Sequence, residues 1–95
     1  MRLLVVEDEP AIREQITTFF LTQKFVVDGV ADGNEGHYYA SEYDYDLAII
    51  DLGLPGMDGI TLIKKLRESG KTYPILVLTA RGDWQDKVAG LESGA

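Results

Sequence analysis

The sequence predicts an α/β fold: a doubly wound parallel sheet with helices on both of its faces. Short apolar runs bounded by turn residues alternate with segments in which apolar residues recur at helical spacing. This alternation is typical of buried parallel strands joined by crossover helices. Right-handed crossovers place such helices on both faces of the sheet. With 95 residues and an apolar fraction of 45%, the chain is one domain, residues 1–95, with enough apolar residues for a packed core.

The first half of the chain contains two predicted strands and two predicted helices. The strand over residues 2–6 precedes a helix that begins near Pro10, where the missing N–H of a proline costs nothing. The apolar stripe of this helix is Ile12, Ile16, Phe19 and Phe20. After a strand over residues 26–30, the turn Asp32-Gly33-Asn34 caps a helix that reaches about Tyr43. The residues of this second helix that can face the sheet are Tyr39, Ala40 and Tyr43.

The second half repeats the pattern. Strands are predicted over residues 47–50 and 75–78, separated by a helix over 58–69 that ends at Gly70. The apolar side of that helix is Ile60, Ile63 and Leu66. A last helix is predicted from an N-cap at Asp83 to about Glu92. Its inward-facing residues are Trp84, Val88 and Leu91.

Acidic residues and one hydroxyl follow three of the apolar runs. Glu7 and Asp8 follow the first strand, Asp51 follows the third and Thr79 follows the fourth. In an open parallel sheet the functional crevice lies outside the carboxyl ends of the strands. We therefore expect these four side chains to converge at one edge. Carboxylates gathered there favour a cation, and a carboxylate held beside a divalent cation can attack phosphorus.

These motifs resemble the receiver (CheY-like) domain of bacterial response regulators. That family has an acidic pair after strand one, a phosphoacceptor Asp after strand three and Thr-Ala after strand four. The stretches Asp51-Leu-Gly-Leu-Pro-Gly-Met-Asp-Gly and Leu78-Thr-Ala-Arg-Gly-Asp-Trp-Gln-Asp-Lys-Val are similar to the OmpR/PhoB subfamily, nearest to PhoP- and QseB-like transcriptional regulators. The resemblance covers residues 1–95 and implies a flavodoxin/CheY-like sheet with strand order 2-1-3-4.

The resemblance also implies a magnesium site and a phosphoacceptor. Asp8, Asp51 and the backbone carbonyl of Gly53 would be direct ligands of Mg²⁺, with Glu7 nearby through water. Asp51 would accept a phosphoryl group from a sensor histidine kinase. The chain is then not an enzyme, beyond self-catalysed phosphotransfer and autodephosphorylation. A structural interpretation stays open, in which Glu7, Asp8 and Glu9 only complement the N-terminus of the first helix.

Thr79 and Ala80 are candidates for contact with the phosphoryl oxygens. Thr79 offers a hydroxyl, and Ala80 offers a backbone N–H beside a small side chain. The structural alternative is that Thr79 caps the helix that follows it.

Two other phosphate chemistries fit less well. A haloacid-dehalogenase-type phosphatase would need an Asp where this chain has Gly53, and in a flavodoxin-like cofactor site the acidic segment 7–9 would repel phosphate.

The chain ends at Ala95, before the family's fifth strand with its Lys-Pro pair and before the fifth helix. The DNA-binding domain of OmpR-type regulators is also absent, so regulation of transcription would belong to the full-length protein. Without the lysine, a phosphoryl oxygen lacks a charge-assisted hydrogen bond. We also expect strand 75–78 to be an open edge and the sheet face beside the first helix to be bare, so the chain should self-associate. The alternative function is an interaction or self-assembly module that is not phosphorylated.

Composition limits the partners of this domain. The net charge of −7 argues against direct contact with nucleic acid or an anionic membrane surface. The chain contains no cysteine, which excludes disulfides and cysteine-based metal sites. No apolar stretch approaches the length of a membrane span, and acidic residues interrupt the N-terminal apolar run before it could act as a signal peptide. These features fit a cytoplasmic protein.

Overall fold

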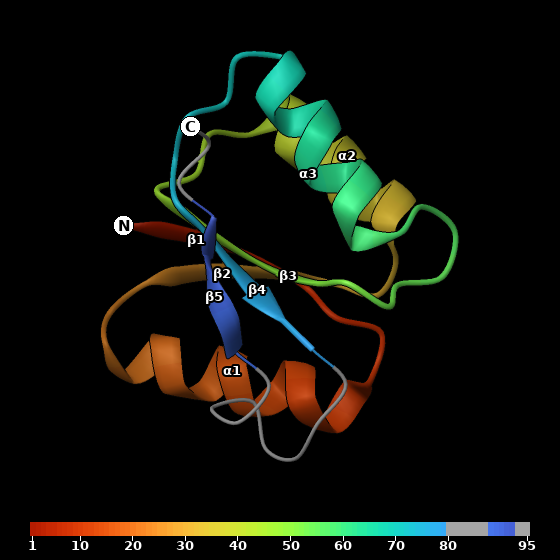
Figure 1. Ribbon diagram of the computed structural model, residues 1–95. Coiled ribbons are helices and arrows are strands. Elements are labelled where there is room, and N and C mark those ends of the chain that lie inside the picture. Colours follow the sequence, from red (N-terminus) through yellow and green to blue (C-terminus); the bar gives the residue numbers. More distant parts are fainter. Residues whose placement is uncertain (80–87, 93–95) are drawn as a thin grey trace.

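A central sheet with helices on both faces forms the molecule (Figure 1). The computed structural model describes residues 1–79 and 88–92. The elements in chain order are β1 (Arg2–Val6), α1 (Pro10–Thr22), β2 (Val26–Val30), α2 (Gly33–Glu42), β3 (Leu47–Asp51), α3 (Gly59–Glu68), β4 (Ile75–Leu78) and β5 (Val88–Glu92). Within the described ranges, no helix combines the length and the apolar character needed to cross a bilayer.

The strands lie in the order β2-β1-β3-β4-β5. The first four are parallel, which confirms the predicted order 2-1-3-4, and β5 runs antiparallel to β4. The register pairs Val6 with Ile50 and Asp51 with Leu78. Because parallel strands with this register end at the same level, the residues that follow β1, β3 and β4 meet at one edge of the sheet.

Two apolar clusters hold the layers together. Alternate residues of β1 divide between them, since side chains of a strand point to opposite faces. Leu4 and Val6 belong to the cluster that includes residues of α3, whereas Leu3 and Val5 belong to the cluster that includes residues of α1. All four are fully buried, and each buried side chain of this size contributes roughly 1.5–3 kcal/mol. Figure 1 shows α1 on one face of the sheet and α2 with α3 on the other.

The cap predicted at Asp32 is confirmed, and Asp58 forms a second cap that was not predicted. The Asp32 carboxylate accepts a hydrogen bond from the backbone N–H of Glu35 at 2.8 Å, at the start of α2. Asp58 caps α3 in the same way through the N–H of Thr61 at 2.8 Å, which lowers the pKa of Asp58. Beyond the end of α3, Gly70 has a φ of +91°, the left-handed conformation that favours glycine at this position.

Three residues predicted to face the core are exposed instead. Phe19 on α1 is 41% exposed and packs edge-to-face on the neighbouring Phe20. Tyr43 lies just beyond α2, where its ring stacks under the Arg2 guanidinium at 4.8 Å. Ile60 on α3 is 55% exposed, and Leu62 is fully buried. Ile63 and Leu66 are buried as predicted, so Ile60 alone is misplaced on this helix, and Leu62 completes its inner face.

The helix predicted over residues 83–92 is wrong in its second half. Residues 88–92 form β5, whereas 83–87 lie outside the described part of the chain. The backbone N–H and C=O groups on the outer side of β4 need hydrogen-bond partners, and residues 88–92 supply them in an extended conformation. Val88 and Gly90 are also poor helix formers. The pairing extends from Ile75 opposite Glu92 to Leu78 opposite Val88, with an irregularity in between.

Strand 75–78 is consequently not an open edge, and that expectation is wrong. The sheet face beside α1 is also better covered than expected. Ile49 and Leu78, which lie on that face, are fully buried, and Leu76 is partly buried. The described residues therefore do not display the bare apolar area on which the expected self-association was based.

Candidate metal centre

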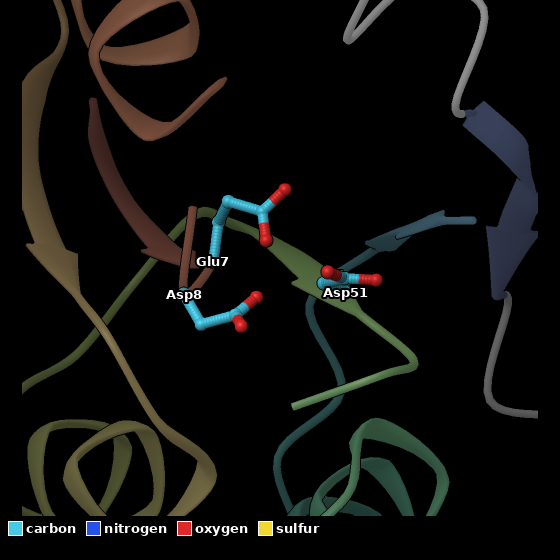
Figure 2. Close-up of side chains that lie close together, drawn as sticks. All are labelled: Glu7, Asp8 and Asp51. Carbon is cyan, nitrogen blue, oxygen red and sulfur yellow. The ribbon is translucent and has the colours of Figure 1, made fainter. Parts of the chain in front are cut away.

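Three carboxylates meet at the carboxyl ends of β1 and β3. One oxygen from each of Glu7, Asp8 and Asp51 lies within 4.8 Å of the others. Figure 2 shows Glu7 and Asp8 entering this cluster from the end of β1 and Asp51 from the end of β3. Glu7 is 0% exposed and Asp51 is 5% exposed, whereas Asp8 is exposed to solvent. The predicted convergence of the acidic residues is confirmed, because neighbouring parallel strands bring their ends together.

Backbone hydrogen bonds fix Glu7 in position. Its N–H donates to the carbonyl of Val30 at 3.1 Å, which continues the pairing of β1 with β2. Its carbonyl accepts from the Arg13 guanidinium at 2.8 Å, and its carboxylate accepts from the N–H of Glu9 at 3.5 Å. Sequence reasoning did not single out Arg13. The sequence did place this arginine in the first turns of α1, close to the acidic pair, and that proximity could have identified it.

Asp51 is held by the turn that follows β3. Its Oδ1 accepts from the backbone N–H of Gly53 at 3.2 Å. The N–H of Leu52 donates to the carbonyl of Leu78 at 3.2 Å, and the N–H of Gly59 donates to the carbonyl of Leu52 at 3.1 Å. The carboxylate is therefore oriented before any ligand binds. Gly53 itself is exposed, and no atom lies within 4 Å of the position that a Cβ would take.

The cluster is suited to a hard divalent cation. Two of its three carboxylates are buried, where like charges are poorly screened. Two unit charges at 4.8 Å, the upper limit of separation for these oxygens, repel by about 3.5 kcal/mol at an effective dielectric constant of about 20. An oxygen-only donor set of one or two direct carboxylates, with room for water on the exposed side of Asp8, is what Mg²⁺ prefers. The residues present therefore fit the ion that the sequence implied.

The two predicted phosphoryl contacts are only partly described. Thr79 follows Leu78, the register partner of Asp51, so it lies at the same edge as the acidic cluster. Its side chain is half-buried. Ala80 lies outside the described residues. The roles of both residues stay predictions.

Sequence comparison assigns this arrangement to a family. The Response regulator receiver domain family matches residues 3–95. Over 95 residues the chain is 59% identical to the two-component response regulator PhoP of Pseudomonas aeruginosa. That match covers 100% of this chain and 42% of the relative, so the chain spans less than half the length of that regulator.

Solved structures with the same fold include a metal complex and a kinase complex. The response regulator TrrA of Thermotoga maritima in complex with Mg²⁺-BeF has a TM-score of 0.79 and 33% identity, over 85% of this chain and 70% of that one. TrrA in complex with the histidine kinase ThkA has a TM-score of 0.77 and 32% identity, over 88% of this chain and 72% of that one. This chain belongs to the response regulator receiver domain family, and its similarity is to PhoP-type transcriptional regulators.

Proposed function

We propose that this chain is the receiver module of a two-component system and accepts a phosphoryl group on Asp51 from a sensor histidine kinase. The observation that carries the proposal is the cluster of Glu7, Asp8 and Asp51 at the ends of β1 and β3. A relative that is a two-component response regulator, and a similar structure in complex with a histidine kinase, support it.

In this proposal Asp51 is the nucleophile. One of its carboxylate oxygens forms a bond to phosphorus while the bond from phosphorus to the donor nitrogen breaks, and the electron pair of that bond stays on the nitrogen. The product is an aspartyl phosphate. Asp8, Asp51 and the carbonyl of Gly53 would hold Mg²⁺, with Glu7 nearby through water. Mg²⁺ would supply compensation for negative charge on the phosphoryl oxygens.

The other residues have supporting roles. The N–H of Gly53 donates to the Asp51 carboxylate at 3.2 Å and would hold it in place before a phosphoryl donor arrives. Thr79 and the backbone N–H of Ala80 would contact phosphoryl oxygens. Arg13 holds the Glu7 carbonyl at 2.8 Å and thereby fixes the start of the acidic loop.

The output of the full-length protein is also a proposal. Relatives of the PhoP type are more than twice as long as this chain, and we propose that a further domain binds DNA and regulates transcription. We place the module in the cytoplasm, where a histidine kinase could reach it. It acts as a phosphoacceptor with self-catalysed phosphotransfer and autodephosphorylation, and not as an enzyme on a separate substrate.

The alternative of a self-assembly module without phosphorylation is less well supported. Its structural basis was an open edge on strand 75–78, and that strand pairs with β5. The acidic cluster has no role under this alternative. Self-association therefore stays a prediction that light scattering at micromolar concentration would test.

The deciding experiment is intact-mass analysis after incubation with acetyl phosphate and Mg²⁺. We expect the parent chain to gain the mass of one phosphoryl group, slowly, and to lose it again on standing. Asp51→Asn should gain nothing, because an amide is not a nucleophile here. Removing Mg²⁺ with a chelator should suppress the reaction in the parent. Phosphorylation that persists in Asp51→Asn would contradict the proposal, as would a parent chain that acquires no phosphoryl group.

A further inference from the structure

A glycine on α2 lies in backbone contact with the loop that follows Asp51. A Cβ built on Gly33 would lie 1.7 Å from the carbonyl oxygen of Met57 and 2.6 Å from its carbonyl carbon. The N–H of Gly33 donates to the carbonyl of Pro55 at 3.2 Å. The start of α2 is therefore pressed against residues 52–58, which connect β3 with α3, and only a residue without a side chain fits between them.

The same loop is held at two further points. At its far end, a Cβ on Gly59 would lie 2.2 Å from the carbonyl oxygen of Asp51, and the Gly59 N–H bonds the carbonyl of Leu52 at 3.1 Å. In its middle, a Cβ on Gly56 would lie 2.7 Å from the side-chain nitrogen of Asn34, the residue after Gly33. The loop that contains Gly53 is thus clamped between the N-termini of α2 and α3.

We propose that Gly33 is a positioning residue for the metal centre, acting through the loop over residues 52–58. This inference rests on the proposed function, in which Gly53 and Asp51 hold Mg²⁺. The atoms nearest to a Cβ on Gly33 belong to Met57, and not to Gly53 or Asp51. Its contact with Pro55 and Met57 determines how far the loop lies from α2. The position of the loop in turn determines where the Gly53 carbonyl and N–H lie. Since Mg²⁺ demands near-ideal octahedral geometry, a displacement of an ångström in one ligand weakens binding strongly.

Substitution of Gly33 has a matched control on the same helix. Gly36 is also buried on α2, and its Cβ would meet side-chain methyl groups, 2.9 Å from Val6 and 3.1 Å from Leu62. Gly33→Ala and Gly36→Ala both overpack the underside of α2, but the atoms nearest to the added methyl group belong to the loop only at Gly33. By isothermal titration we expect Gly33→Ala to lose on the order of tenfold in Mg²⁺ affinity. Gly36→Ala should stay within about twofold of the parent because its contacts are with the core.

A measurement on the parent protein tests the same coupling without any substitution. If loop position and metal binding are linked, then Mg²⁺ must in turn stabilise the loop against the start of α2. Saturating Mg²⁺ should slow hydrogen exchange of the Gly33 amide, which donates to Pro55, several-fold more than that of the Gly36 amide, which donates to Asp32 at 3.0 Å. This readout is available even if Gly33→Ala does not fold.

The outcomes separate the inference from the function on which it rests. Equal Mg²⁺ affinity in Gly33→Ala and the parent, or a Gly33 amide whose exchange Mg²⁺ leaves unchanged relative to Gly36, overturns the inference alone. A parent chain that binds no Mg²⁺, or an Asp8→Asn variant that binds it as tightly as the parent, overturns the proposed metal centre and with it the inference. Weakened binding in Gly33→Ala together with Mg²⁺-dependent protection of its amide supports the inference.

Discussion

Replacing Asp8 by asparagine should stabilise the metal-free protein while removing its response to Mg²⁺. Asp8, Glu7 and Asp51 offer oxygens within 4.8 Å of one another, and two unit charges at that upper limit repel by about 3.5 kcal/mol at an effective dielectric constant of about 20. Asp8 is exposed, so water and relaxation remove most of this repulsion. We therefore expect Asp8→Asn to raise the free energy of unfolding of the apoprotein by about 1–2 kcal/mol.

Magnesium should narrow or reverse the difference in stability between the two proteins. An ion that binds only the folded state at ten times its Kd adds about 1.4 kcal/mol to the parent, because stabilisation grows with the logarithm of ligand concentration. Asp8→Asn has lost a direct ligand in the proposed centre and should gain much less. The parent should therefore approach or overtake the variant as Mg²⁺ is added.

Urea denaturation followed by far-UV circular dichroism, with and without Mg²⁺, measures both effects. Glu14→Gln is a suitable control, since Glu14 is exposed on α1 and its replacement changes the net charge equally. The control should leave apoprotein stability within about 0.5 kcal/mol and keep the Mg²⁺ response. If Asp8→Asn destabilises the apoprotein, or keeps the full Mg²⁺ response, the carboxylates do not form a repelling metal centre.

Two further predictions concern the rest of the fold. The Tyr45 hydroxyl donates to the Asp28 carboxylate at 2.7 Å. Burial, and to a smaller extent this hydrogen bond, raises the pKa of Tyr45. The stability that the neutral hydroxyl contributes is therefore present below the ordinary pKa near 10 and is lost at higher pH. In urea denaturation at neutral pH, Tyr45→Phe should be about 1 kcal/mol less stable than the parent. Above pH 10, the variant should lose less of its free energy of unfolding than the parent does. An equal loss in both proteins would refute the assignment. On α3, Leu62→Ala should cost about 2–5 kcal/mol and Ile60→Ala less than about 1 kcal/mol in urea titrations, because Leu62 is fully buried and Ile60 is 55% exposed. Similar costs at both positions would mean that α3 is rotated relative to the sheet.

The sequence predicts those parts of the fold that local signals determine. Three of the four predicted parallel strands coincide with apolar runs, and Asp32 caps α2 because its short carboxylate reaches a backbone N–H within one turn. The acidic cluster is predictable for a different reason. Once β1 and β3 are known to be parallel neighbours, Glu7 and Asp51 have to meet, whatever the details of packing.

Other features depend on contacts between distant segments and have no local signal. Gly33 reads as an ordinary turn residue until the carbonyl of Met57 is placed beside it. The contact of Arg13 with the Glu7 carbonyl likewise needs the helix position. Residues 88–92 carry helical spacing in the sequence, yet they form β5, because the hydrogen bonds that β4 offers outweigh a weak local preference.

The proposed metal centre and the proposed phosphoryl contact lie at different strands of the sheet. Glu7 directly follows β1, and Asp51 is the last residue of β3. β1 pairs with β2 and β3, and β3 pairs with β1 and β4. Interior strands open least readily, so the acidic residues of the proposed metal centre lie beside the most stable part of the sheet. Thr79 instead follows β4, whose outer partner β5 has an irregular antiparallel register. A change in the pairing of β4 with β5 should therefore affect Thr79, the proposed phosphoryl contact, more than the carboxylates of Glu7 and Asp8.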